Sequence, residues 1–472
     1  MEASATKRIA YNTIVQVISR IIVTAISLVA IAYLTRYLGV SGYGQYTVIF
    51  AYLSLIGVVV DFGFFLLQVR EITKFPAQES YVLGNIMGLK LVLSGAVFGL
   101  GYLVALMIYP DTVIHQGILV GALSQTSLAL LQVPISLFQA RLQMQKVAIV
   151  NVVTRAFYLG LVWWAIKNDL GLVGILWGTA IANIFSLGWQ WWWATSMASL
   201  VPRWDVRYWV KFLREALPLG VVMVMATIYF RIDTVMLSVM QDSHAVGIYG
   251  APYKIIEVLL TVPTIFMSSV FPIITQALSE NRDRAVRVFR RAFDIMALAA
   301  WPLAIGTMLI ATPLMTAIAG PDFAASGVPL KLLIWAATLS FVGSTLNYSV
   351  IAAGRQSILV RPYLLAMVFN IVTNWVFIPR YSYMGAAATT VATELLVVVC
   401  VLIIVYRDLR FVPQWGVFAK ASLSALIMGG VIWWVGSVNL LINLGLGAIS
   451  YGAMVLITRA VPRAVVKELL GR

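Results

Sequence analysis

The sequence predicts an all-α polytopic membrane protein with about fourteen transmembrane helices, arranged as two similar lobes of about six helices and two helices beyond them. Three observations lead to this prediction. The chain of 472 residues is 61% hydrophobic and only 11% charged, which excludes a soluble globular domain. Apolar runs of roughly 20 residues, long enough to cross a bilayer, recur from end to end. In addition, one stretch of the first half returns in the second half.

The repeated stretch covers 151–183 and 370–394. In both copies a threonine lies five residues after a glycine, and a polar residue follows four positions later. These positions are Asn151, Gly174, Thr179 and Asn183 in the first copy and Asn370, Gly385, Thr390 and Glu394 in the second. An internal repeat in a membrane chain indicates a transporter whose site lies between its halves. The alternative is that such helix pairs recur by chance in apolar sequence.

The apolar runs locate the predicted spans in chain order. They lie near 11–35, 46–68, 82–108, 116–138, 147–167, 172–195, 217–240, 246–276, 293–317, 329–351, 363–378, 385–406, 421–436 and 440–458. The span 246–276 is long and contains Pro252, Pro263 and Pro272, so we expect it to be bent or broken.

The last two spans lie beyond the repeat, which divides the chain into four predicted parts. These are an N-lobe over 1–200, an interfacial amphipathic linker over 201–216, a C-lobe over 217–406, and two further helices with a cytoplasmic tail over 407–472.

The basic residues set the predicted topology. Outside the spans, most of them lie at the two ends and in alternate loops, whereas the opposite loops hold only Arg36, Lys167, Lys331 and Arg380. The positive-inside rule therefore predicts a multi-pass protein of the plasma (inner) membrane with both termini cytoplasmic. The net charge of +15 then reflects topology and attraction to anionic membrane lipids, and no nucleic-acid partner is expected.

Two predicted cytoplasmic loops, 205–215 and 281–292, have the pattern of amphipathic helices that lie at the membrane interface. The first joins the lobes, so it could also couple their motion. Their apolar positions are Val206, Trp209, Val210 and Leu213 in the first loop and Val286 and Phe289 in the second.

Five basic residues fall inside the spans, where a charge is costly and usually faces a cavity or a partner. They are Arg20, Lys90, Arg155, Arg231 and Lys254. The first three lie about eight or nine residues from the cytoplasmic end of their spans, or ~13 Å deep. Such a layer of cations suits a phosphate headgroup. Snorkelling of long side chains towards the headgroups is the alternative.

The carboxylates within the spans, Asp61, Asp233, Glu257 and Glu394, are candidates for uptake of H⁺ or Na⁺ during transport, or else counter-ions of nearby cations. Glu257 lies three residues after Lys254, so these two are expected to pair.

Several polar residues within the spans are candidate sugar contacts, although each could equally hydrogen-bond a neighbouring helix. They are Gln125, Gln132, Asn151, Asn183, Asn347, Asn370 and Asn374. The sequence contains no P-loop and no catalytic or metal-binding constellation. We therefore expect no enzyme and no cofactor, although transport could be coupled to H⁺, Na⁺ or the membrane potential.

The order of several motifs along the spans resembles a known family. These motifs are 36–46, 61–63, 69–72, 231–236, 246–254 and 370–394. Together they are similar to those of the lipid-linked polysaccharide flippases, the Wzx-type or O-antigen-type branch of the multidrug/oligosaccharidyl-lipid/polysaccharide exporter superfamily. The resemblance covers essentially the whole chain.

The resemblance implies a MATE-like fold of two pseudo-symmetric lobes in a V around a central cavity that opens alternately to either side. It implies translocation of a polyprenyl-(pyro)phosphate-linked oligosaccharide to the outer leaflet, with glycan polymerases or glycosyltransferases as further partners. Related peptidoglycan-precursor flippases carry a cavity arginine in the first helix, which implies such a role for Arg20.

Two other functions remain open at this stage. A cation-coupled multidrug exporter of the same superfamily would need an acidic cavity, whereas Arg20 and Arg155 are basic. A membrane glycosyltransferase or polymer ligase would need large outer loops, whereas the predicted outer loops are short.

Overall fold

The computed structural model describes residues 2–411, 413, 415–436 and 439–460, with side chains from residue 15 onward, and this part of the chain is helical with no strand. The prediction of an all-α protein is thus confirmed. The predicted cytoplasmic tail beyond residue 460 lies outside the described residues.

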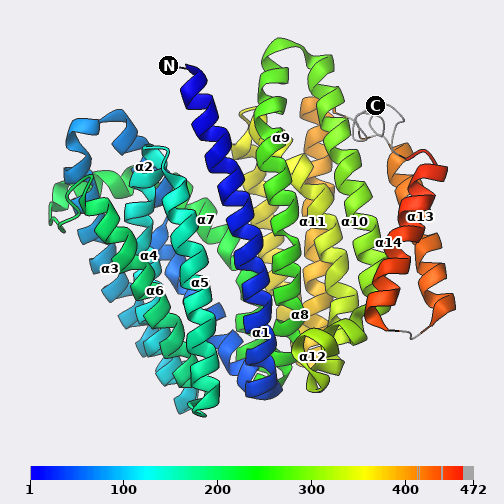
Figure 1. The fold of residues 1–472 in the computed structure, drawn as a ribbon, viewed down its shortest axis with the longest axis horizontal. Helices are drawn as coiled ribbons and strands as arrows, with labels where there is room; N and C mark the ends of the chain where they lie inside the picture. Colours follow the sequence, from blue (N-terminus) through cyan, green and yellow to red (C-terminus); the bar gives the residue numbers. More distant parts are fainter. Residues whose placement is uncertain (1, 412, 414, 437–438, 461–472) are drawn as a thin grey trace. The chain divides into compact units, whose positions relative to one another are not determined.

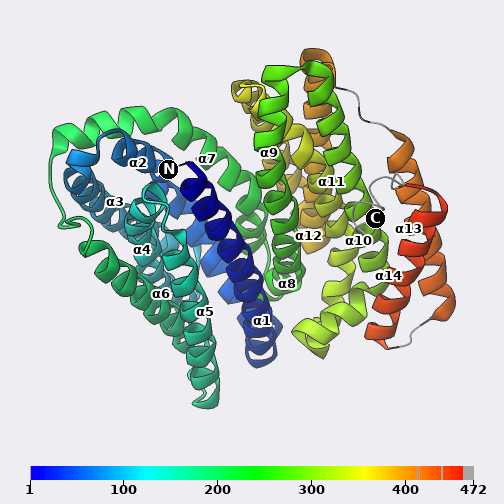
Figure 2. The ribbon, with the colours of Figure 1, turned by 45° about the horizontal axis from the view of Figure 1, so that its top comes forward.

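Helices account for nearly all described residues (Figures 1 and 2). The α-helices are α1 (Glu2–Asp61), α2 (Phe64–Lys74), α3 (Glu79–Ile108), α4 (Thr112–Ala140), α5 (Met144–Lys167), α6 (Gly171–Thr195), α7 (Val206–Met240), α8 (Ser243–Leu259), α9 (Thr261–Glu280), α10 (Arg282–Ala319), α11 (Gly327–Ala352), α12 (Val360–Ile404), α13 (Trp415–Val435) and α14 (Leu440–Ile457). Short turns lie at Pro76–Gln78, Pro321–Ser326, Gln356–Leu359 and Val405–Leu409.

Twelve helical stretches of the described chain are long and apolar enough to cross a membrane. Two of them, Val15–Lys74 and Gln356–Leu409, have 60 and 54 residues. At ~1.5 Å per residue each is far longer than a bilayer of about 30 Å requires. Both of these stretches reverse direction within their length.

Helix α1 reverses at Gly39, whose φ of 63° and ψ of −174° are not helical. Its contacts with α5 show the reversal. Ser19 hydrogen-bonds near the start of α5, to Ala148, and Tyr37 hydrogen-bonds just after its end, to Asp169. Beyond the reversal, Tyr46 hydrogen-bonds to Tyr158, which lies back towards the start of α5. Residues 2–38 and 40–61 are therefore two helices that both pack against α5.

Helix α12 reverses in the same way at Ser382, which has a φ of 51°. Asn370 donates a hydrogen bond to Thr393 across the turn. Closer to the turn, a Cβ atom on Gly385 would lie 2.5 Å from the carbonyl oxygen of Phe377. The second copy of the repeat is thus a helical hairpin, like the first copy in α5 and α6.

The proline-rich stretch 246–276 is broken, as expected. Helix α8 ends at Leu259 and α9 begins at Thr261. Pro263 has no N–H, so the carbonyl of Leu259 loses its normal helical partner at this point. By contrast, Pro252 and Pro272 lie inside α8 and α9.

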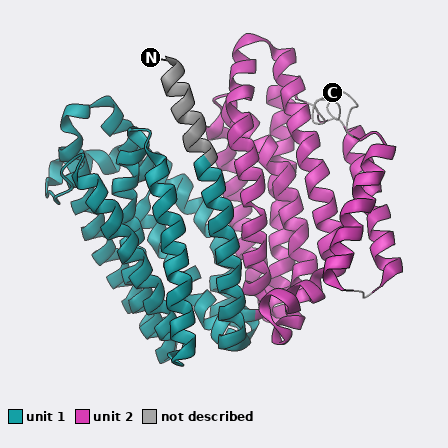
Figure 3. Cartoon of the chain, viewed as in Figure 1, with its two compact units in different colours: residues 1–247 teal, residues 248–472 magenta. Residues whose placement is uncertain are grey.

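The chain divides into two compact units, 1–247 and 248–472 (Figure 3). In the first unit α3, α4, α5 and α6 lie side by side in both views (Figures 1 and 2), and α1 packs against α3, α4, α5 and α7. In the second unit α10 packs against α9, α11, α13 and α14, and α11 packs against α12. The lobe boundaries expected from the sequence stay predictions.

The predicted linker helix is not separate from the span that follows it. It forms the first turns of α7, which runs without a break from Val206 to Met240. Phe212 and Ala216 are buried in the core of the first unit, whereas Val206 and Val210 are exposed. The helix is therefore held by protein contacts as well as by its amphipathic character.

The second amphipathic stretch, 281–292, is likewise the beginning of a longer helix, α10. Phe289 is fully buried, and its ring centroid lies 5.1 Å from that of Phe411. This stretch thus packs on the segment before α13, and a purely interfacial helix is not what the structure shows.

The segment before α7, residues 199–205, lies along α3, and we call it the linker strap. The backbone N–H of Arg203 donates to the carbonyl of Gly84 at 2.8 Å. That of Asp205 donates to the Asn85 side chain at 3.0 Å. A Cβ atom on Gly88 would lie 2.2 Å from the carbonyl oxygen of Arg203. The strap can approach α3 this closely only because α3 has glycines there.

Asp205 fixes the start of α7. Its carboxylate accepts hydrogen bonds from the backbone N–H groups of Arg207 and Tyr208 and from the Tyr81 hydroxyl. The Tyr81 hydrogen bond, followed by the backbone bonds, lowers the pKa of Asp205 below its usual value. A lowered folded-state pKa adds stability above the unfolded pKa, and this stability is lost as pH falls through the folded pKa.

We predict that Gly88→Ala destabilises the first unit by about 1–3 kcal/mol, because the added methyl group collides with strap backbone. Gly95→Ala in the same helix has open space around its Cβ and should keep or raise stability through better helix propensity. Thermal unfolding of the purified protein in detergent compares the two variants. Equal melting temperatures of the two variants would show that the linker strap does not require glycine at position 88.

Candidate functional site

The candidate site begins where α1 gives way to α2. Asp61 is the last residue of α1, and Phe62 and Gly63 follow with φ of 34° and 73°. A Cβ atom on Gly63 would lie 2.8 Å from Leu219. The positive φ and this close contact with α7 both require glycine. The break places the Asp61 carboxylate at a helix end within a predicted span.

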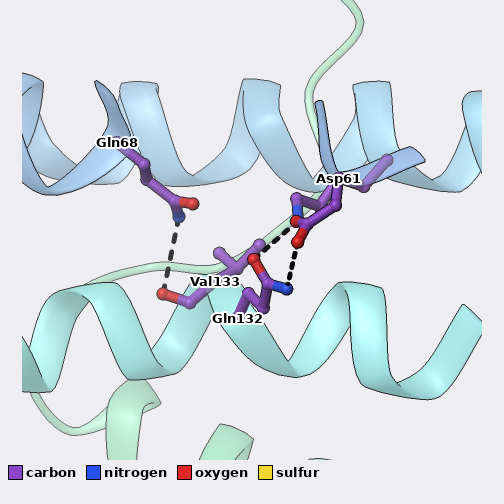
Figure 4. Close-up of polar contacts among 5 residues, drawn as sticks. Asp61, Gln68, Gln132 and Val133 are labelled. Atoms are coloured by element: carbon purple, nitrogen blue, oxygen red, sulfur yellow. Dashed lines mark hydrogen bonds and ion pairs between the residues drawn. The ribbon is translucent and has the colours of Figure 1, made fainter. Parts of the chain in front are cut away.

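Asp61 forms a network with Lys90 of α3 and Gln132 of α4. The Lys90 Nζ lies 2.9 Å from Asp61 Oδ1 and 3.4 Å from Gln132 Oε1. The Gln132 Nε2 donates to Asp61 Oδ2 at 2.7 Å. Figure 4 shows the Asp61 and Gln132 side chains pointing towards each other from facing helices. Each carboxylate oxygen therefore has one donor.

The two charges of this network differ in exposure. The Lys90 side chain is fully buried, whereas that of Asp61 is 41% exposed. A buried ammonium needs a counter-charge, since the loss of hydration is not otherwise recovered. Asp61 supplies that charge, and the ring of Phe64 lies 5.9 Å from the ammonium. Lys90 is thus covered by protein and does not form a layer of open cations.

Next to this network, the buried side chain of Gln68 joins α2 to α4. Its Nε2 donates to the carbonyl of Val133 at 3.5 Å (Figure 4). Pro134 follows within α4 and carries no N–H. The contact therefore lies within one helical turn of the Leu130 carbonyl, which loses its helical donor to Pro134. Gln68 is not among the site residues that the sequence predicts.

The other two cations of the predicted layer have different surroundings. Arg20 is exposed on α1, beside Ser19, which hydrogen-bonds to α5. Arg155 is half-buried on α5, with its guanidinium 5.6 Å from the ring centroid of Tyr158. A cation–π contact of this kind orients a guanidinium without neutralising it. Arg155 is therefore both positioned and charged.

The Tyr158 ring is itself held in place. It is buried and hydrogen-bonds to Tyr46 and to Thr179. Sequence reasoning missed Tyr46 and Tyr158, because aromatic residues are common in apolar runs and carry no distinguishing signal there.

The remaining charged candidates occupy α7 and α8. Asp233 is buried and Arg231 is half-buried, and each makes polar or electrostatic contacts. Lys254 forms the expected ion pair with Glu257, at 2.6 Å. This pair is a local helix contact that leaves Lys254 partly exposed.

A second polar cluster lies inside the α12 hairpin. Asn370 and Asn374 are buried and hydrogen-bond to each other at 3.0 Å, and Asn370 also donates to Thr393. Glu394 is 8% exposed, and Tyr363 lies close to it. Asn370 thus joins the two arms of the hairpin, and Asn374 hydrogen-bonds to Asn370 from the same arm.

The two asparagines of the first repeat are less buried. Asn183 of α6 donates to the Ser124 hydroxyl of α4 at 2.7 Å, which is a contact between helices. Asn151 is exposed on α5. Within the residues searched, no group of three or more His, Cys, Asp or Glu side chains could hold a metal ion.

We predict that Asp61→Ala destabilises the protein by roughly 3 kcal/mol, because it leaves the buried Lys90 ammonium without a counter-charge. The double variant Asp61→Ala/Lys90→Met should recover most of this loss, since no charge stays buried. Thermal unfolding of both variants in one detergent measures the difference. A double variant no more stable than the single one would contradict the claim that Asp61 stabilises the protein as the counter-charge of Lys90.

Comparison with known proteins agrees with this architecture. A family profile described as "Polysaccharide biosynthesis protein" matches residues 9–278. A second profile, described as MatE, matches residues 218–376.

The relatives at the sequence level are distant. The "Probable low-salt glycan biosynthesis flippase Agl15" of Haloferax volcanii is 21% identical over 95% of both chains. The "Probable flippase AglR" of the same organism is 22% identical over 51% of this chain, and the match spans only 53% of that relative. The "Putative O-antigen transporter" of Shigella dysenteriae is 20% identical over 79% of this chain and 94% of its own length.

Solved structures share the fold. A structure of the lipid II flippase MurJ in an inward-closed conformation has a TM-score of 0.78 at 17% identity, and the match covers 98% of this chain and 100% of that one. An inward-facing multidrug resistance MATE family transporter has a TM-score of 0.64 at 12% identity, with 84% and 98% covered. All these relatives are flippases or transporters, in agreement with the prediction that the chain is not an enzyme.

Proposed function

The chain belongs to the polysaccharide biosynthesis protein family, and we propose that it is a flippase for a polyprenyl-(pyro)phosphate-linked oligosaccharide. The observation that carries the proposal is the full-length likeness to a glycan-biosynthesis flippase, joined to the fold of a lipid II flippase. Half-buried Arg155, oriented by Tyr158 and without a carboxylate within ion-pair distance in the described chain, is the group best suited to a phosphate.

The proposal includes a membrane topology. The reversals at Gly39 and Ser382 divide two of the twelve candidate stretches, so we propose about fourteen crossings. An even number of crossings puts both termini on one side. The distribution of basic residues favours the cytoplasmic side of the inner membrane.

The proposed mechanism is alternating access. Two lobes related by the internal repeat would rock about a site between them, and the lipid chain would stay in the bilayer. Asp233 and Glu394 are buried carboxylates and are our candidates for coupling to H⁺ or Na⁺. Glycan polymerases or glycosyltransferases would supply or consume the lipid-linked glycan.

The direct test is the sidedness of lipid-linked glycan in a strain that lacks the gene. We expect glycolipid to accumulate on the cytoplasmic leaflet, and the restored gene to return glycan to the outer leaflet. Normal outer-leaflet glycan in the deleted strain would contradict the proposal. Uptake of cationic drugs into proteoliposomes would then test the multidrug-exporter alternative, which the MatE match keeps open.

Charge reversal tests the phosphate-binding role. We predict that Arg155→Glu abolishes complementation while the amount of protein in the membrane stays unchanged, because a carboxylate repels the phosphate. Arg20→Glu should do the same. The exposed Arg287 on α10 offers the matched control, and Arg287→Glu should complement fully. Full activity of both Arg20→Glu and Arg155→Glu would refute the cationic site.

A further inference from the structure

We propose that Asp61 is a sugar-binding residue that accepts hydrogen bonds from hydroxyl groups of the glycan, and that Lys90 and Gln132 are positioning residues for it. This inference rests on the proposed flippase function. It differs from the expected roles, because sequence reasoning assigned substrate binding to the cation and either ion uptake or a counter-ion role to the carboxylate.

Exposure decides which member of the pair meets a ligand. The Lys90 side chain is fully buried and that of Asp61 is 41% exposed. The ammonium thus lies behind the carboxylate, and an incoming molecule would contact the carboxylate first. A charged side chain within a span faces the bundle interior or a water-filled cavity rather than lipid chains. The exposed side of Asp61 therefore fits an aqueous path.

The hydrogen bonds already present define what Asp61 can still accept. A carboxylate has about four lone-pair sites. Within the described chain, Lys90 uses one on Oδ1 and Gln132 uses one on Oδ2. One site on each oxygen is left for a ligand. Two adjacent acceptors suit two neighbouring hydroxyl groups, which is the donor pattern of a sugar ring.

Charge argues for a neutral donor at these two sites. The Lys90 ammonium lies only 2.9 Å from Oδ1, so the pair has no net charge. Such a pair attracts a further cation only weakly. A hydroxyl group needs no compensating charge. Sugar hydroxyls are therefore a better match than a metal ion or a cationic drug.

The network also orients the carboxylate in advance. Lys90 and Gln132 hold both oxygens from two different helices, and the Phe62–Gly63 turn places Asp61 at the end of α1. A donor group that binds here loses less freedom than one that must first order a mobile carboxylate. Asp61 can then distinguish a glycosylated lipid from a bare one, while a cation such as Arg155 binds the phosphate common to both.

The test measures binding by the purified full-length protein in nanodiscs. The probes are a polyprenyl pyrophosphate without sugar and the same lipid carrying glucose, galactose or N-acetylglucosamine. The wild type should bind at least one glycosylated probe more tightly than the bare lipid. Asp61→Ala/Lys90→Met, which leaves no buried charge, should reduce that preference by roughly 3- to 10-fold. It should bind the bare lipid as the wild type does.

Asp408→Asn is the matched control. Asp408 also pairs with a basic residue, Arg355 at 3.5 Å, and its side chain is 35% exposed. This variant should keep the full preference for the glycosylated probe. The single variant Asp61→Asn, which keeps the shape of the side chain, should lose preference as the double variant does.

Three results would overturn the inference. They are an unchanged sugar preference in both Asp61 variants, an equal loss of affinity for bare and glycosylated lipid, and binding of Na⁺ or H⁺ that disappears with Asp61. A wild type that binds none of these lipids would instead count against the proposed flippase function. The two ideas therefore fail by different observations.

Discussion

The pairing of buried charge dominates the first unit. Lys90 is fully enclosed. Among the described residues, the Asp61 carboxylate neutralises its charge and the Gln132 amide oxygen accepts a second hydrogen bond. The network needs α1, α3 and α4 at fixed distances. It also needs the Phe62–Gly63 turn that ends α1 at Asp61. Charge neutralisation in a low-dielectric interior thus links the helix break, the packing and the chemistry of the site.

Close backbone contacts form the second constraint. The linker strap lies on Gly84 and Gly88 of α3, and backbone N–H groups of the strap are satisfied there. In α1, shortly after the reversal at Gly39, a Cβ atom on Gly44 would lie 1.7 Å from the carbonyl oxygen of Ser243. Glycine permits helices and connecting segments to approach to backbone contact, which is a frequent solution in membrane proteins. These contacts give the first unit several fixed junctions along α3 and α1.

The polar groups of the two copies of the repeat have different partners. In the first copy Asn183 binds a neighbouring helix, and Arg155 keeps its charge over Tyr158. In the second copy, Asn370 and Asn374 form hydrogen bonds within the hairpin itself, which also contains the buried Glu394. The same helical hairpin therefore carries a positive group in one copy and a carboxylate in the other. This difference supports our proposal that an anionic headgroup binds at the first copy.

The sequence by itself determined the helical class, the approximate positions of the apolar stretches, a bend or break within 246–276 and the pairing of Lys254 with Glu257. Each depends on local spacing, because a bilayer demands long apolar helices and residues three apart share a helix face. Only the tertiary structure decided that Lys90 lies behind Asp61, that Arg155 rests on Tyr158, and that the linker helix continues into α7. These contacts join residues far apart in the chain, and no spacing rule predicts which helices will meet.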